Sequence, residues 1–192
     1  MTTLIALLRG INVGGNNKLP MKELSALLEG MGLSEVRTYI QSGNVVFECS
    51  KKDKPKLAAN ITAAIKAQHG FAPHVLLLEA AELKQAMAGN PYPEAEAEPG
   101  SLHLFFLDET PRQPDLKALE GLKVNKESFK LAGRVFYLHA PDGVGNSKLA
   151  ARAEKLLGVA ATARNWNTVC KLAEMALKTS GSNQPQTHAR HL

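Results

Sequence analysis

Aromatic residues are scarce in this chain of 192 residues, and cysteine is rarer still. Phe, Trp and Tyr make up 5% of the sequence, while hydrophobic residues as a whole make up 44%. A core can therefore form, but aliphatic side chains must fill most of it. The two cysteines, Cys49 and Cys170, are too few for a disulfide framework, and we expect two packed thiols in a reducing compartment. The sequence leaves open a disulfide between them.

The sequence contains no long apolar run. None approaches the roughly 20 residues that a membrane-spanning helix needs. The N-terminus also lacks the basic region, apolar stretch and cleavage site of a secretory signal. These absences predict a soluble cytoplasmic protein with no membrane partner. The formal net charge of +5 at pH 7 is a mild excess that favours an anionic partner without specifying one.

Motifs that would specify a reaction are also missing. The chain holds no G-x-G-x-x-G fingerprint and no G-x-S-x-G elbow, and its histidines show no metal-ligand spacing within a predicted element. Gly10 and Gly15 have the spacing of the two P-loop glycines, but Asn16-Asn17-Lys18 replaces the Lys-Ser/Thr pair of that motif. We therefore expect no metal site and no ATP hydrolysis, and the sequence identifies no cofactor.

The periodicity of apolar residues predicts a strand–helix–strand–strand–helix–strand order that occurs twice. In the first half these elements are predicted at 4–8, 21–31, 36–40, 45–49, 57–68 and 75–78. In the second half they are predicted at 102–107, 114–122, 126–131, 134–139, 147–157 and 162–164. A last helix is expected at 168–178. This βαββαβ order predicts an α+β fold with two ferredoxin-like halves and an additional C-terminal helix.

Composition also suggests where the halves meet. A short helix is predicted at 80–88, and it is followed by Gly89-Asn90-Pro91-Tyr92-Pro93 and an acidic stretch that ends at Gly100. We therefore expect a first half at 1–89, a linker at 90–101 and a second half with the last helix at 102–179. The polar tail at 180–192 is expected to be disordered.

The richest candidate for a binding site is the stretch from Arg9 to Lys18, which connects the first strand to the first helix. Gly and Asn tolerate positive φ, so such a loop can aim successive backbone N–H groups at an anion. The plainer interpretation is a long connection that needs glycine to turn. Charges at both ends of the loop favour binding, and the candidate ligand-binding residues here are Arg9, Asn12, Gly14, Gly15, Asn16 and Lys18.

A second candidate segment, Arg164-Asn165-Trp166-Asn167-Thr168, leads into the last helix. Asn167 or Thr168 can cap that helix, and the single tryptophan is expected to pack in the core. Neither interpretation accounts for Arg164 and Asn165, so both join the predicted ligand-binding set.

Two further segments are lesser candidates, and a structural role explains most of each. Gln41-Ser42-Gly43-Asn44 is typical of a hairpin turn, in which Gly43 and Asn44 would supply the positive φ; this leaves Gln41 and Ser42 less well explained. Gly143 to Lys148 is a second glycine-rich helix entry, where Lys148 and the helix N-terminus suit a phosphate. Gln41, Ser42, Asn44 and Lys148 are retained as lesser site residues.

Several stretches together resemble one family. They are Ile5 to Gly15, Tyr39 to Val45, Asn90-Pro91 and Arg164 to Thr168. The chain is identified as a member of the domain-of-unknown-function family 1697, over about residues 2 to 178. The resemblance implies an α+β fold with ferredoxin-like halves. It implies no reaction, because the biochemical role of the family is not established.

Three classes of function stay open: a binding module for a small anionic, phosphate-containing ligand, a nucleic-acid-binding protein, and an enzyme of unknown reaction. The predicted central strands are aliphatic on both faces and show no pattern of exposed aromatics for RNA, which favours a sheet covered by the other half. We also expect the first and third strands to be parallel neighbours. That arrangement would put the Gly-rich loop and the 41–44 turn at opposite ends of one sheet, so the loop is predicted to pair with 164–168.

Overall fold

The computed structural model describes residues 1–50, 53–124 and 126–181, which form two four-stranded antiparallel sheets with helices. The first sheet has the strand order β2-β3-β1-β4. The elements of this half are β1 (Thr2–Arg9), α1 (Met21–Gly30), β2 (Ser34–Tyr39), β3 (Asn44–Cys49), α2 (Lys54–His69) and β4 (His74–Glu79). The strand order and the βαββαβ succession are those of a ferredoxin-like half.

The second sheet has the equivalent order, β6-β7-β5-β8. Helix α3 (Ala80–Ala88) and a short 3-10 helix η1 (Pro93–Ala97) lead into it. The remaining elements are β5 (Leu102–Leu107), α4 (Leu116–Leu122), β6 (Ser128–Ala132), β7 (Val135–His139), α5 (Lys148–Leu157), β8 (Ala161–Asn165) and α6 (Trp166–Gly181). The α+β fold with two ferredoxin-like halves and a C-terminal helix, predicted from the sequence, is confirmed.

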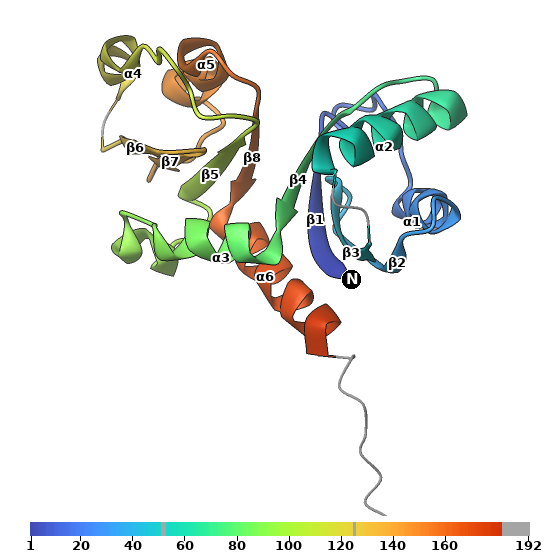
Figure 1. Ribbon diagram of the computed structural model, residues 1–192. Coiled ribbons are helices and arrows are strands. Elements are labelled where there is room, and N and C mark those ends of the chain that lie inside the picture. The colour runs from blue at the N-terminus through green and yellow to red at the C-terminus, as the bar shows by residue number, and fades with distance from the viewer. Residues whose placement is uncertain (51–52, 125, 182–192) are drawn as a thin grey trace, which may run out of the picture.

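Each sheet has an outer face covered by its own two helices. In the first half Leu4 and Leu8 of β1 pack with residues of α1 and α2. In the second half Phe105 and Leu107 of β5 pack with residues of α4 and α5. Figure 1 shows α1 and α2 on one side of the molecule and α4 and α5 on the other, so the outer helices of the two halves lie on opposite sides.

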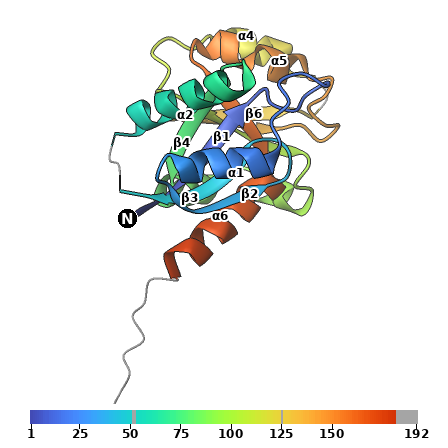
Figure 2. The same cartoon turned by 90° about the vertical axis from the view of Figure 1, so that its right-hand side faces the viewer.

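The inner faces of the two sheets share a third core, which contains α3 and α6. Leu7 of β1, Phe106 of β5 and Trp166 of α6 are all buried within it. Helix α6 contacts strands of both halves and runs between them in Figure 1, and Figure 2 shows it extending below the first sheet. This middle layer is why the central strands are apolar on both faces: the inner face of each sheet meets α6 and the other half instead of water.

The pairing of β1 with β3 corrects one expectation from the sequence. The two strands are antiparallel neighbours, not parallel ones, with Leu7 opposite Asn44. In a split βαβ unit the helix crossover makes the flanking strands parallel, and the strand between them runs the other way. The end of β1 therefore lies beside the start of β3. The Gly-rich loop and the 41–44 turn lie at the same end of the sheet, contrary to the prediction.

Several element boundaries shift because side chains cap the helices. Asp53 accepts a bond from the backbone N–H of Lys56, so α2 begins three residues earlier than its apolar pattern indicates. Ser147 caps α5 as predicted, with its hydroxyl accepting from the Ala150 N–H. Helix α6 continues to Gly181, beyond the predicted start of the tail, and residues 182–192 lie outside the described part of the chain.

Two further findings concern the cysteines and the helix lengths. Cys49 is buried and Cys170 is half-buried, and no disulfide joins them. Among the described residues, no helix has the length and apolar character that crossing a membrane requires.

Candidate functional site

The Gly-rich loop folds into a small hairpin of its own. Val13 and Asn16 form an isolated β-bridge, and the Asn16 N–H donates to the Val13 carbonyl at 3.0 Å. Gly14 and Gly15 between them have φ values of 58° and 79°, the left-handed pair that a tight two-residue hairpin turn requires. The tip is exposed. Its glycines are therefore explained by the turn, and Gly14, Gly15 and Asn16 project into solvent.

Asn12 anchors this hairpin to the rest of the first half. Its side-chain amide donates to the carbonyls of Leu19 and Gln41, at 2.9 and 2.8 Å, and its Oδ1 accepts from the Leu19 N–H at 2.8 Å. With φ at 54°, Asn12 occupies a backbone region that asparagine tolerates better than most residues. Asn12 was predicted to bind a ligand. In the structure both the amide nitrogen and the amide oxygen of its side chain already hold the loop in place.

The turn between β2 and β3 approaches β1 very closely. The Leu8 N–H donates to the Gly43 carbonyl at 2.8 Å. A Cβ at Gly43 would lie 2.6 Å from the Leu8 Cβ, and the φ of Gly43 is 77°. Glycine is required here on both grounds. The second positive φ in the turn belongs to Ile40, not to Asn44, which lies in β3 and is fully buried.

Arg164 of β8 connects the two halves through its guanidinium. Its Nε donates to the Asn44 Oδ1 at 2.5 Å, and one terminal nitrogen donates to the carbonyls of Leu8 and Ser42 at 2.7 and 3.0 Å. The other terminal nitrogen donates to the carbonyl of Ala163 at 2.8 Å. All of these acceptors are uncharged. Burial lowers the pKa of Arg164 to about 10, so the group still carries its positive charge at neutral pH.

Arg9, at the end of β1, makes a second polar link between the halves. Its guanidinium is paired with Glu154 of α5 and donates to the Ala161 carbonyl of β8 at 3.0 Å. Glu154 also accepts from the Ala161 N–H at 3.3 Å. The pair is half-exposed, so water and salt screen it.

Arg9 and Arg164 line one cleft of about 580 Å³ between the halves, together with Gly10 and Ser42. Helix α5 supplies its opposite wall and adds Glu154 and Lys155. The lining thus contains three cationic side chains and one carboxylate. The sequence did not single out Lys155, although its place on the exposed face of an amphipathic helix was a visible signal. The remaining wall is largely apolar.

The other predicted residues have separate positions. Asn165 caps α6, because its Oδ1 accepts from the Thr168 N–H at 3.0 Å; this corrects the assignment of the cap to Asn167 or Thr168. Trp166 is buried in the core between the sheets. Lys18 and Lys148 are exposed outside the lining of this cleft, and Gln41 faces the loop through its carbonyl.

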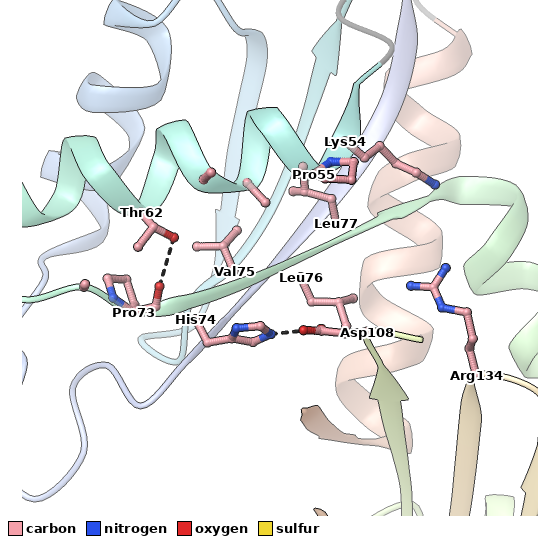
Figure 3. A pocket seen from close by; sticks show the side chains of 13 residues that line it. Lys54, Pro55, Thr62, Pro73, His74, Val75, Leu76, Leu77, Asp108 and Arg134 are labelled. Atoms are coloured by element: carbon pink, nitrogen blue, oxygen red, sulfur yellow. Dashed lines mark hydrogen bonds and ion pairs between the residues drawn. The ribbon is translucent and has the colours of Figure 1, made fainter. Parts of the chain in front are cut away.

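A larger cavity of about 680 Å³ lies beside the outer edge of β4. Figure 3 shows Lys54 and Arg134 projecting toward it from opposite sides, with the His74–Asp108 pair below the strand. The Lys54 Nζ lies 2.7 Å from Glu82 and 3.3 Å from Glu79, and Arg134 also pairs with Glu82. Lys54 and Arg134, the Lys and Arg side chains that line this cavity, are therefore already paired with carboxylates. The described residues form no cluster of ligands that could hold a metal ion.

Comparison with known proteins places the chain in a family. A family model described as a protein of unknown function, DUF1697, matches residues 1–137. The protein belongs to the DUF1697 family. A conserved bacterial protein, SP0830 from Streptococcus pneumoniae, has a similar solved structure, with 23% sequence identity and a TM-score of 0.60 over 91% of this chain and 98% of that one. No curated protein matches.

These comparisons bear on fold and membership alone. At this identity the structural likeness shows that the DUF1697 chain shares a fold with the bacterial protein. The family match ends within β7, so α5 and the segment from Arg164 to Thr168 lie beyond it. One wall of the cleft thus comes from the matched region and the other from outside it.

Proposed function

We propose that this DUF1697 protein binds a small anionic, phosphate-containing ligand in the cleft between its halves. The observation that supports this most is the charge of the lining, where Arg9, Arg164 and Lys155 face a single carboxylate, Glu154. Since the acceptors of Arg164 are all uncharged, its charge has no counter-ion among them. A partly buried cation without a carboxylate partner attracts an anion from solvent.

Each cation has a distinct part in the proposed site. Arg164 is held by Asn44 and by backbone carbonyls, so its position is fixed before the ligand arrives. Arg9 would exchange part of its contact with Glu154 for the ligand, and Lys155 would supply a mobile charge at the rim. Gly14 and Gly15 at the hairpin tip lie outside the lining of the cleft, so they have no direct role in the proposed site. The loop contributes Arg9, Gly10, Ile11 and Val13 to the lining of the cleft.

Calorimetric titration with pyrophosphate at low salt tests the proposal. Lys155→Gln removes one rim charge from an exposed side chain, and we expect pyrophosphate affinity to fall about fivefold, the effect of one solvent-screened charge pair. Lys66→Gln on α2 makes the same change in net charge on an exposed residue of the first half. The proposal fails if the wild-type protein binds no pyrophosphate, or if both variants bind it equally well.

Two related assignments are also proposals. A cytoplasmic location agrees with two cysteines that are not joined by a disulfide. Nucleic-acid binding, the second candidate function, is favoured by a group of cations on α5 that continues from the cleft.

A further inference from the structure

Helix α5 presents a row of basic side chains to solvent. Lys148, Arg152 and Lys155 fall within about 60° of one another around the helix axis, at 100° per residue. All three are exposed, whereas Leu149, Ala153 and Leu157 on the opposite side are buried. Within the described residues none of the three takes part in an ion pair. We call these three residues the α5 basic row.

The α5 basic row joins the cleft at Lys155, which belongs to both. From there the lining continues to Arg9, which is paired with the one carboxylate Glu154, and to Arg164, whose acceptors are all uncharged. Measured as rise along the helix axis, the row spans about 10 Å, with about 6 Å from Lys148 to Arg152 and about 4.5 Å from Arg152 to Lys155. The cleft and the row together form one track of positive charge that begins on the helix surface and ends between the halves.

We propose that this track binds the backbone of single-stranded nucleic acid, with successive phosphates along the α5 basic row and one phosphate in the cleft. The inference deepens the proposed anion site and rests on it. A nucleic acid strand carries a charge at every few ångströms, which suits cations spaced as these are. Val13, which is 65% exposed and lines the cleft, offers an apolar contact to a base.

Other polyanions fit the track less well. A flat membrane surface would reach the α5 basic row but not Arg164, which is partly buried and lines the cleft. A DNA duplex is too wide to enter a cleft of about 580 Å³ with its backbone. A single strand is thin enough to follow both the helix and the cleft. Recognition through phosphates alone predicts binding without sequence preference.

Fluorescence anisotropy with a labelled oligo-dT of about ten nucleotides tests the inference, measured between about 50 and 200 mM KCl. The test variant is Lys148→Gln/Arg152→Gln, whose two residues lie outside the cleft lining. We expect its affinity at low salt to fall about tenfold, and the slope of log K against log salt to become shallower by about 1.4. The control, Lys56→Gln/Lys66→Gln on α2, makes the same change in net charge and is expected to bind like the wild type.

The outcomes separate this inference from the anion site itself. Pyrophosphate binding that persists in Lys148→Gln/Arg152→Gln while oligo-dT binding drops supports both. Pyrophosphate binding without any binding of oligo-dT overturns the inference and leaves the anion site standing. Equal loss of oligo-dT affinity in the α2 control, or duplex DNA bound as tightly as the single strand, also overturns it.

Discussion

The Nε of Arg164 lies 2.5 Å from the Oδ1 of Asn44, a residue 120 positions earlier in the chain. Asn44 is fully buried, and its Nδ2 in turn donates to the Ser42 hydroxyl at 2.9 Å and the Tyr39 carbonyl at 3.2 Å. The amide of Asn44 therefore orients the guanidinium while it closes the turn that precedes β3. One contact couples the geometry of the first half to a cation contributed by the second.

Replacing Arg164 by lysine should destabilise the protein although the charge is kept. An ammonium cannot reproduce the planar fork that reaches Asn44, Leu8 and Ser42 together. The acceptors left without a donor should lower the free energy of unfolding by about 2–3 kcal/mol, which urea unfolding measures. The exposed Arg152→Lys on α5 is the matched control, with a change within about 0.5 kcal/mol. Equal stability of Arg164→Lys and the wild type would show that the fork is dispensable.

Gly43→Ala should cost far more than Gly14→Ala. Both glycines have positive φ, at 77° and 58°, which an alanine adopts only with strain. Gly14 has open space around it, so we expect a loss of about 1 kcal/mol in its unfolding free energy. At Gly43 a Cβ would also collide with Leu8, which should raise the loss to about 3 kcal/mol. Similar thermal midpoints for the two variants would contradict the close approach.

The Glu82 carboxylate should make stability depend on pH in the acid range. Burial alone would raise its pKa, but the Glu79 backbone N–H and the Lys54 ammonium outweigh this and hold the pKa below 4.5. The unfolded chain therefore binds more protons, so stability should be full above pH 4.5 and decline as the pH falls through the folded pKa.

Glu82→Gln tests this dependence by urea unfolding at several pH values. The variant should be less stable than the wild type at pH 7, and the difference should narrow as the pH falls below 4.5. Glu29→Gln on α1 is the control, because it removes the same negative charge from an exposed position. A difference that stays constant with pH would remove Glu82 from the acid response.

Leu7→Asp should prevent folding. Leu7 is fully buried in the core that the two sheets share with α6, and its removal alone forfeits about 1.5–3 kcal/mol before the buried carboxylate is considered. Burying a carboxylate without a partner costs several kcal/mol more, so the sum is comparable with the roughly 5–15 kcal/mol by which a native domain is stable. Far-UV circular dichroism should report an unfolded chain, whereas Thr2→Asp at the exposed start of β1 should fold. A folded Leu7→Asp protein would contradict the middle core.

Local patterns were sufficient for most of the secondary structure. The alternation and helical spacing of apolar residues predicted the βαββαβ order twice, and Ser147 was recognised as a cap because its hydroxyl acts within one helical turn. The start of α2 was less visible, since the Asp53 cap lies before the apolar pattern begins. Arg9, Arg164 and Ser42 were named from their residue types, and the structure brings them to one cleft.

The sequence by itself determined which segments become strands and helices, that the core is largely aliphatic, and that polar residues collect at 9–18, 41–44 and 164–168. Tertiary structure decided how those places meet. The antiparallel pairing of β1 with β3 brings Leu7 opposite Asn44, and the docking of β8 brings Arg164 to the same end. Lys155 joins them only because α5 packs across that end. Such contacts depend on strand direction and on long-range packing, which no local spacing of residues encodes.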